Sequence, residues 1–149
     1  MGAMSARLGL AGRFLQAALR LTRGLLGMAA PWRVWLLALV LANLVVPLAM
    51  FSDRPEARIV IATFLAGATL MTVLTMLTGF SRLLGLAHFF WFPLLYYLWT
   101  RTTVIGAEEP YGLWLRTVMI VDAISLTIDV TDVARYLAGE RADLLRERP

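Results

Sequence analysis

Four long apolar stretches alternate with short polar connections along this chain. They are residues 34–51, 59–80, 83–100 and 113–134. Each has about 18 to 22 residues, close to the roughly 20 that a helix needs to cross a bilayer. Because the connections are short, consecutive helices should run antiparallel as neighbours. The pattern predicts an all-α integral membrane protein whose single domain, residues 1–149, is an antiparallel bundle of four transmembrane helices.

The chain before the first apolar stretch has a different pattern. Over residues 5–29, Arg13, Arg20 and Arg23 recur at helical spacing, apolar side chains fill other positions, and no acidic residue occurs. This pattern is typical of an amphipathic helix that lies in the membrane interface. We expect it on the cytoplasmic face, in contact with the lipid bilayer. A mitochondrial transit peptide has a similar composition, and docking of this helix on a partner protein is a further alternative.

The composition supports a membrane protein. Of the 149 residues, 60% are hydrophobic and only 16% are charged, too few to cover a small soluble domain. There is no cysteine, which excludes disulfides, thiolate metal sites and cysteine nucleophiles. One histidine provides too few ligands for a histidine metal cage. We therefore expect no cofactor, no metal site and no catalytic residue, and we expect that the protein is not an enzyme.

The basic residues are all arginine, and they follow the ends of the predicted helices. Ten of the 14 lie before residue 34, in the connection after residue 80, or in the tail at residues 135–149. The positive-inside bias therefore predicts that both termini are cytoplasmic. Arginines placed at helix ends do not form a solvated basic face, so we expect no nucleic-acid partner. The expected location is a bacterial inner membrane, which the protein crosses several times.

One face of the fourth predicted helix is acidic. Asp122, Ser125, Asp129 and Asp132 are three, four and three positions apart, which places them along one stripe of a helix. An aspartate at bilayer depth costs about 2.5 to 3.5 kcal/mol on insertion scales. The stripe therefore cannot face lipid. Water, a bound cation, protonation or donors on neighbouring helices would have to compensate for these carboxyl groups.

Counting residues from the predicted membrane boundaries suggests partners for two of these aspartates. His88 and Asp129 are both about 9 Å from the cytoplasmic boundary, and Asn43 and Asp122 are both about 12 Å from the outer one. The sequence therefore predicts a His88–Asp129 pair and an Asn43–Asp122 pair. Each pair has two interpretations: a group with a function, or a static contact that locks the helices together.

Other polar positions allow a functional and a structural interpretation as well. Asp132 is expected to pair with Arg82 or Arg135 at the membrane end. Thr72 and Thr75 either line the same polar face as the aspartates or belong to a packing face, and the packing face is the preferred interpretation. We expect Pro47 and Pro93 to kink their helices, because each removes a backbone donor. The carbonyl groups freed in this way, those of Asn43 and Phe89, would be able to bind a cation or a hydroxyl.

Three functions fit these features. The leading one is a cation or proton pathway, formed by a homo-oligomer whose fourth helices bring their aspartates together as acidic rings. The alternative is a non-catalytic subunit or assembly partner of a larger membrane protein complex. The third is a quinone-binding or lipid-headgroup-binding protein with its site at His88 and Asp129.

Overall fold

The computed structural model describes residues 9–144, and every regular element in that range is a helix. The elements in chain order are α2 (Leu10–Leu26), α3 (Ala30–Val40), the π-helix η1 (Leu41–Val45), α4 (Val46–Met50), α5 (Pro55–Thr78), the 3₁₀-helix η2 (Arg82–Phe90), α6 (Trp91–Arg101) and α7 (Pro110–Leu137). The all-α prediction is confirmed. The expected helical residues 5–8 and tail residues 145–149 lie outside the described residues.

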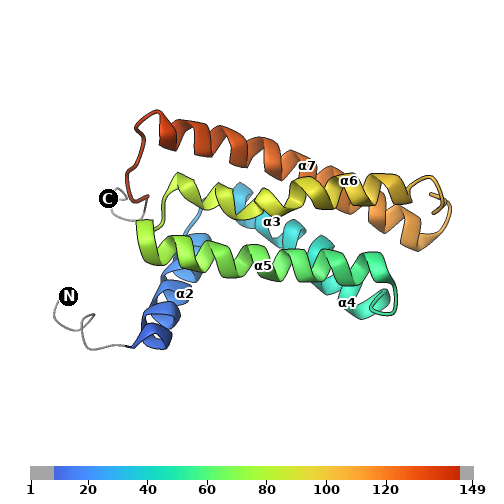
Figure 1. The fold of residues 1–149 in the computed structure, drawn as a ribbon, viewed down its shortest axis with the longest axis horizontal. Coiled ribbons are helices and arrows are strands. Elements are labelled where there is room, and N and C mark those ends of the chain that lie inside the picture. The colour runs from blue at the N-terminus through green and yellow to red at the C-terminus, as the bar shows by residue number, and fades with distance from the viewer. Residues whose placement is uncertain (1–8, 145–149) are drawn as a thin grey trace.

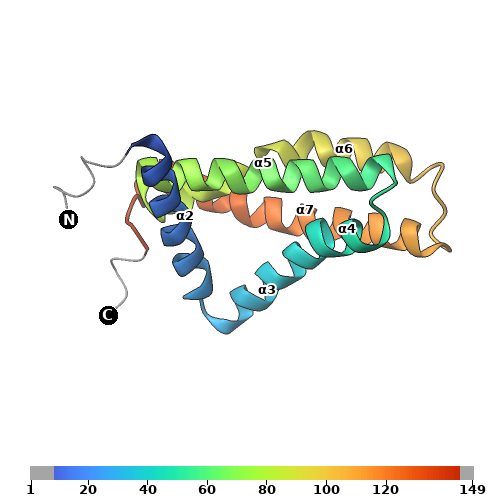
Figure 2. The same ribbon diagram turned by 90° about the horizontal axis from the view of Figure 1, so that it is seen from below.

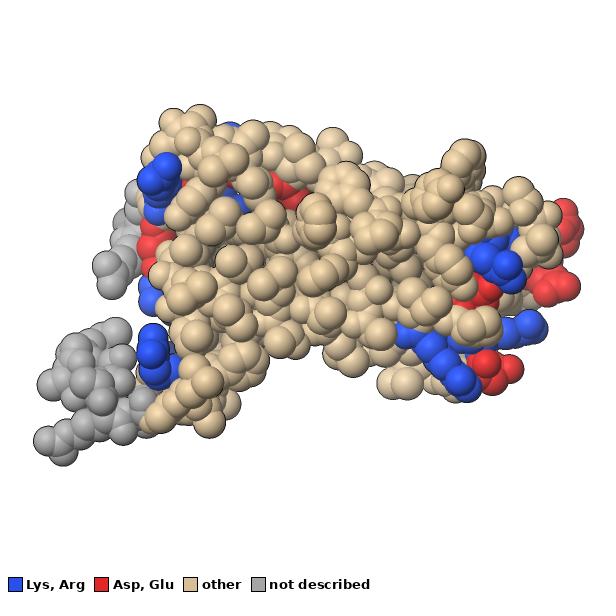
Figure 3. Space-filling model, in the orientation of Figure 1, with Lys and Arg blue, Asp and Glu red and all other residues tan. Residues whose placement is uncertain are grey.

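Three helical runs are long and apolar enough to cross a membrane. They are Ala30–Met50, Pro55–Thr78 and Arg82–Arg101. Large apolar side chains face outward along them, including Leu65, Leu77 and Phe89. On the face shown in Figure 3, charged side chains gather toward the two ends of the molecule, with a broad uncharged band between them. By their length and composition, these three helices are compatible with insertion in a membrane, which agrees with the coarse prediction of a membrane protein.

Three of the helices begin three or four residues earlier than the sequence predicted. The first begins at Ala30 instead of residue 34, and the other two begin at a proline. α5 begins at Pro55 instead of residue 59, and α7 begins at Pro110 instead of residue 113. Proline suits the first turn of a helix because its missing N–H would have no partner there. The polar residues around each proline resemble a connection in the sequence, which explains the error. α5 ends at Gly79, whose φ of 75° lies in the left-handed region that glycine tolerates.

The predicted helices at residues 34–51 and 83–100 are not uniform. The first passes through the π-helix η1 before Pro47, and the second begins as the 3₁₀-helix η2 before Pro93. In both cases a new α-helix begins just ahead of the proline, which then occupies its first turn. A missing N–H costs little at that position. In both segments the helix type thus changes just ahead of the proline.

The long helices lie side by side and alternate in direction (Figure 1). α5 and α7 each run the length of the molecule, and η2 with α6 lies alongside both. Figure 2 shows α3 leaving α2 at an angle and meeting the other helices along α4. α2 lies across the end of the molecule opposite the loop between α6 and α7.

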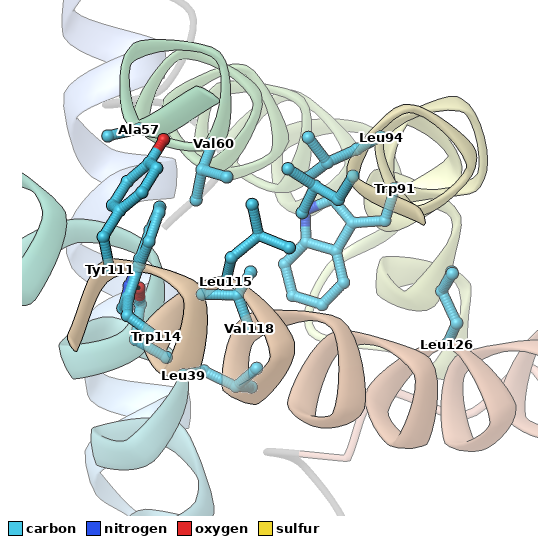
Figure 4. Close-up of a cluster of buried hydrophobic side chains, with 12 residues drawn as sticks. Leu39, Ala57, Val60, Trp91, Leu94, Tyr111, Trp114, Leu115, Val118 and Leu126 are labelled. Carbon is cyan, nitrogen blue, oxygen red and sulfur yellow. Dashed lines mark hydrogen bonds between the residues drawn. The ribbon is translucent and has the colours of Figure 1, made fainter. Parts of the chain in front are cut away.

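The buried side chains form two clusters. The larger one joins α3, α5, α6 and α7 and includes Val60, Trp91, Leu115 and Val118 (Figure 4). The smaller cluster anchors α2. Its members are Leu21, Leu74, Phe80, Leu84 and Ala87.

Further contacts hold α2 and the end of the chain together. A Cβ atom on Gly24 would lie 2.5 Å from the Phe80 ring, so only glycine allows α2 to approach this closely. Arg20 of α2 forms an ion pair with Asp143, and the Leu144 N–H donates to the Phe80 carbonyl at 2.9 Å. The segment after α7 therefore fastens α2 to the end of α5.

Candidate functional site

The predicted pair of Asn43 and Asp122 is present and fully buried. Asn43 Nδ2 donates to Asp122 Oδ1 at 2.8 Å and to the Leu39 carbonyl at 3.2 Å. Neither Asn43 nor Asp122 has any exposed surface. The pair joins η1 to α7 at the larger buried cluster.

The π-helical turn around Asn43 explains a second contact with α7. The Val46 N–H donates to the Leu41 carbonyl instead of to the Ala42 carbonyl, as it would in a regular α-helix. The Ala42 carbonyl instead accepts a hydrogen bond from the Trp114 indole at 2.9 Å. The sequence had suggested free carbonyl groups at Asn43 and Phe89, so this partner was not foreseen.

Two acceptor atoms of the buried pair have no partner. Asn43 Oδ1 and Asp122 Oδ2 are both buried and accept no hydrogen bond within the described part of the chain. A buried acceptor without a donor is costly, and a buried, unpaired charge costs more. A proton on Asp122 would remove the charge and would provide a donor where only acceptors are present. The arrangement is therefore suited to holding a proton.

His88 and Asp129 form the second predicted pair. His88 Nδ1 and Asp129 Oδ2 are 2.7 Å apart, and both side chains are largely buried. The His88 ring packs against Trp91 with ring centroids 4.2 Å apart. A Cβ atom on Gly85 would lie 2.9 Å from the Asp129 carbonyl oxygen, so this glycine lets η2 approach α7 closely. That close approach brings the histidine to the aspartate.

Asp132 has an arginine partner, as predicted. Arg82 Nη1 lies 2.5 Å from Asp132 Oδ1, and Arg82 Nε lies 3.2 Å from Glu140 Oε2. Arg135, the other candidate, pairs with Glu140 at 2.9 Å instead. Hydrogen bonds from Arg135 lower the pKa of the Glu140 carboxyl group. Each aspartate on the acidic face of α7 thus has a partner within the same chain.

An apolar cavity of about 360 Å³ lies beside these pairs. α2, α3, α5, η2 and α7 all contribute to its wall. Its apolar lining includes Leu21, Leu25, Leu36, Leu39, Phe64 and Met71, and its polar lining includes Ser81, Arg82, His88, Ser125, Asp129 and Asp132. The sequence had suggested a ligand site at His88 and Asp129, which both line this cavity, but it did not predict that α2 and α3 contribute to the wall.

Ser125 lies on the wall of the cavity. Its side chain is mostly buried, and its hydroxyl has no hydrogen-bond partner among residues 9–144. By contrast, Thr72 and Thr75 do not line the cavity. Their hydroxyls donate to the Ala68 and Met71 carbonyls of α5 at 2.9 Å. This geometry favours the packing interpretation of the two threonines.

A polar network at the opposite end of the molecule was not predicted. Glu56 is only 3% exposed, and it accepts hydrogen bonds from Arg101 Nε at 2.7 Å and from the Tyr111 hydroxyl at 2.6 Å. Arg54 lies over the Tyr111 ring, 5.0 Å from its centroid. One feature of the sequence could have predicted the Glu56–Arg101 pair: the two residues have opposite charges and lie near the same predicted membrane boundary.

The described residues contain no group of three or more histidine, aspartate or glutamate side chains able to hold a metal ion. The groups that the site provides are paired carboxyl groups, one histidine, the Ser125 hydroxyl and an apolar cavity. Comparison of the chain with protein families, with curated proteins and with solved structures finds no match.

Proposed function

We propose that α7 is a fourth membrane-spanning helix, so that the chain forms an antiparallel four-helix bundle with cytoplasmic termini. Its 28 residues correspond to about 42 Å of helix, more than a bilayer core requires. Asp122, Asp129 and Asp132 keep their polar atoms toward partners in the same chain. These pairings reduce the cost of placing carboxyl groups at membrane depth.

In this arrangement α2 lies in the cytoplasmic interface. Leu15, Leu19 and Leu26 are at least half exposed on one side of the helix, while Arg13 and Arg23 occupy another side. This distribution suits a helix that rests between lipid chains and headgroups. It supports the amphipathic helix expected from the sequence.

We infer that the protein binds a lipid-soluble amphiphile in the cavity, and one observation carries this inference. A largely apolar cavity inside a membrane protein has a hydrogen-bonding cluster, Ser125, His88 and Asp129, on one wall. Apolar pockets with a few convergent polar groups are typical ligand sites, and 360 Å³ lies within their usual range of about 300 to 1,000 Å³. The apolar wall would hold a hydrocarbon or isoprenoid part, and the cluster would contact the polar end.

The experiment is to purify the full chain in mild detergent and to identify the lipids that remain bound by mass spectrometry. Ala68 lines the cavity and Thr69 does not, although both side chains are exposed and adjacent on α5. Ala68→Phe should fill the cavity and remove the bound amphiphile, whereas Thr69→Phe should retain it. Equal retention by both variants would contradict the proposal. The intact mass also shows how many copies, or which partners, travel together.

A proton or cation pathway is the second candidate, and the two unpartnered oxygens of Asn43 and Asp122 favour it. An acidic ring between copies is less well supported, because Asp122 has no exposed surface within one chain. A proton relay within the chain agrees better with this burial. In proteoliposomes, Asp122→Asn should abolish proton flux while the fold is kept. No flux from the unmodified protein would exclude this candidate.

A further inference from the structure

We infer that the cavity selects an uncharged amphiphile whose polar end is a hydroxyl group. This inference rests on the proposed function and adds the chemical class of the ligand. It distinguishes long-chain alcohols and hydroquinone-like molecules from phospholipids and isoprenoid phosphates. Two independent features of the cavity wall support it: its charge and its free hydrogen-bonding atoms.

Within residues 9–144, the charged groups that line the cavity leave no cation available for an anionic headgroup. Arg82 is the arginine that lines the cavity, and its guanidinium is shared between Asp132 at 2.5 Å and Glu140 at 3.2 Å. The remaining ionisable groups are His88 and Asp129, which pair with each other. A phosphate in the cavity would meet the carboxylates of Asp129 and Asp132, and the described lining offers no free arginine to offset them. Binding of phosphate groups usually depends on such an arginine or lysine.

The free atoms on the wall are mainly acceptors. In the neutral imidazole whose Nδ1–H donates to Asp129 Oδ2, the other ring nitrogen is an acceptor. Asp129 Oδ1 and the Ser125 hydroxyl have no hydrogen-bond partner within residues 9–144. A ligand hydroxyl can donate to one of these acceptors and can accept from Ser125. A phosphodiester has no proton to donate, so it would leave these acceptors unpaired.

The apolar part of the wall accommodates the rest of such a molecule. Leucine, methionine and aromatic side chains from α2, α3 and α5 form much of the remaining wall. Trp32, Trp35 and Trp91 are among the lining residues, so a quencher attached to a bound chain would lie close to several indoles. Their fluorescence provides a direct signal of occupancy that needs no functional assay.

The test compares farnesol with farnesyl phosphate, which share one chain and differ only in the polar end. The full chain is held in nanodiscs, and each probe competes with a long-chain alcohol carrying a nitroxide that quenches tryptophan fluorescence. Farnesol should compete roughly tenfold better or more, because its hydroxyl can donate to the free acceptors, whereas the carboxylates of Asp129 and Asp132 repel the phosphate. Ser125→Ala should weaken farnesol binding roughly 2- to 10-fold, the usual effect of one hydrogen bond.

Two further variants distinguish a change in the preference for farnesol over farnesyl phosphate from a general loss of binding. Thr127→Ala removes an exposed hydroxyl of α7 that bonds to the Ala123 carbonyl, so it should leave both affinities unchanged. Asp129→Asn removes a negative charge while keeping an acceptor, so it should narrow the preference for farnesol over farnesyl phosphate. An unchanged preference in this variant would overturn the charge argument.

The possible failures are distinguishable. If neither probe displaces the quencher and the quencher itself does not bind, the cavity is not a ligand site and the proposed function fails as well. If farnesyl phosphate competes as well as farnesol or better, the amphiphile site stands and the inference of a neutral hydroxyl ligand is overturned.

Discussion

The side-chain amide of Asn43 donates to the carboxyl group of Asp122 across 79 positions of the sequence, and neither side chain is exposed. The π-helical turn of η1 carries the asparagine, and α7 carries the aspartate. Because the bond lies among apolar side chains, Asp122 depends on Asn43 as its donor, whereas Asn43 also donates to the Leu39 carbonyl. This dependence makes the pair accessible to a double-mutant test.

Asn43→Leu should destabilise the fold by roughly 1 to 3 kcal/mol, because it leaves the buried carboxyl group of Asp122 without a donor. Adding Asp122→Leu should restore much of the loss, since two apolar side chains need no partner in this environment. Denaturant unfolding of the four proteins of the cycle in detergent measures the coupling. Losses that simply add in the double variant would show that the contact contributes nothing to stability.

Gly85→Ala should destabilise the packing of η2 on α7. The added Cβ would lie 2.9 Å from the Asp129 carbonyl oxygen and 3.0 Å from its Cα, and backbone atoms cannot turn away as a flexible side chain would. Overpacking of this kind typically costs about 1 to 3 kcal/mol. Gly9→Ala is the matched control, since nothing lies within 4 Å of a Cβ at that position. Equal melting temperatures for the two variants would contradict the close approach.

Acid should remove the contribution of Glu140 to stability. Arg135 lowers the pKa of this carboxyl group below its usual 4.5, so the unfolded chain takes up the proton first as the pH falls. The stabilisation is complete above about pH 4.5 and is lost as the pH falls through the lower, folded value. Because the group is exposed, the effect should be small.

The measurement is the difference in melting temperature between the unmodified protein and Glu140→Gln as a function of pH. The difference should be present at neutral pH and should disappear in acid. A Glu140→Gln difference that persists well below pH 4.5 would mean that protonation of this carboxyl group is not responsible.

Reporter fusions test the proposed topology. A fusion after Arg141 should behave as cytoplasmic, and one between Glu108 and Tyr111 should behave as external, because ten of the 14 arginines lie on the side assigned to the cytoplasm. An alkaline phosphatase and green fluorescent protein pair reports the two sides with opposite signals. An external tail would rule out four membrane crossings and the assignment of α7 as the fourth.

The sequence was sufficient to predict the helical class and three of the contacts. Because the rise of a helix per residue is constant, counting from the membrane boundaries gives the depth of each side chain. Depth alone predicted Asn43 with Asp122 and His88 with Asp129, and the structure contains both pairs. The cost of leaving a carboxyl group unpaired in an apolar environment makes such matches informative.

Only the tertiary structure decided the rotation and tilt of the helices, and the cavity depends on both. The sequence does not contain the angle at which α3 leaves α2, which follows from the packing of Leu21 and Gly24 against α5 and Phe80. The sequence also did not decide which way Thr72 faces. It did not show that Glu56 is buried and paired with Arg101. Periodicity shows which positions share a face, but contacts among all the neighbouring helices determine what that face meets.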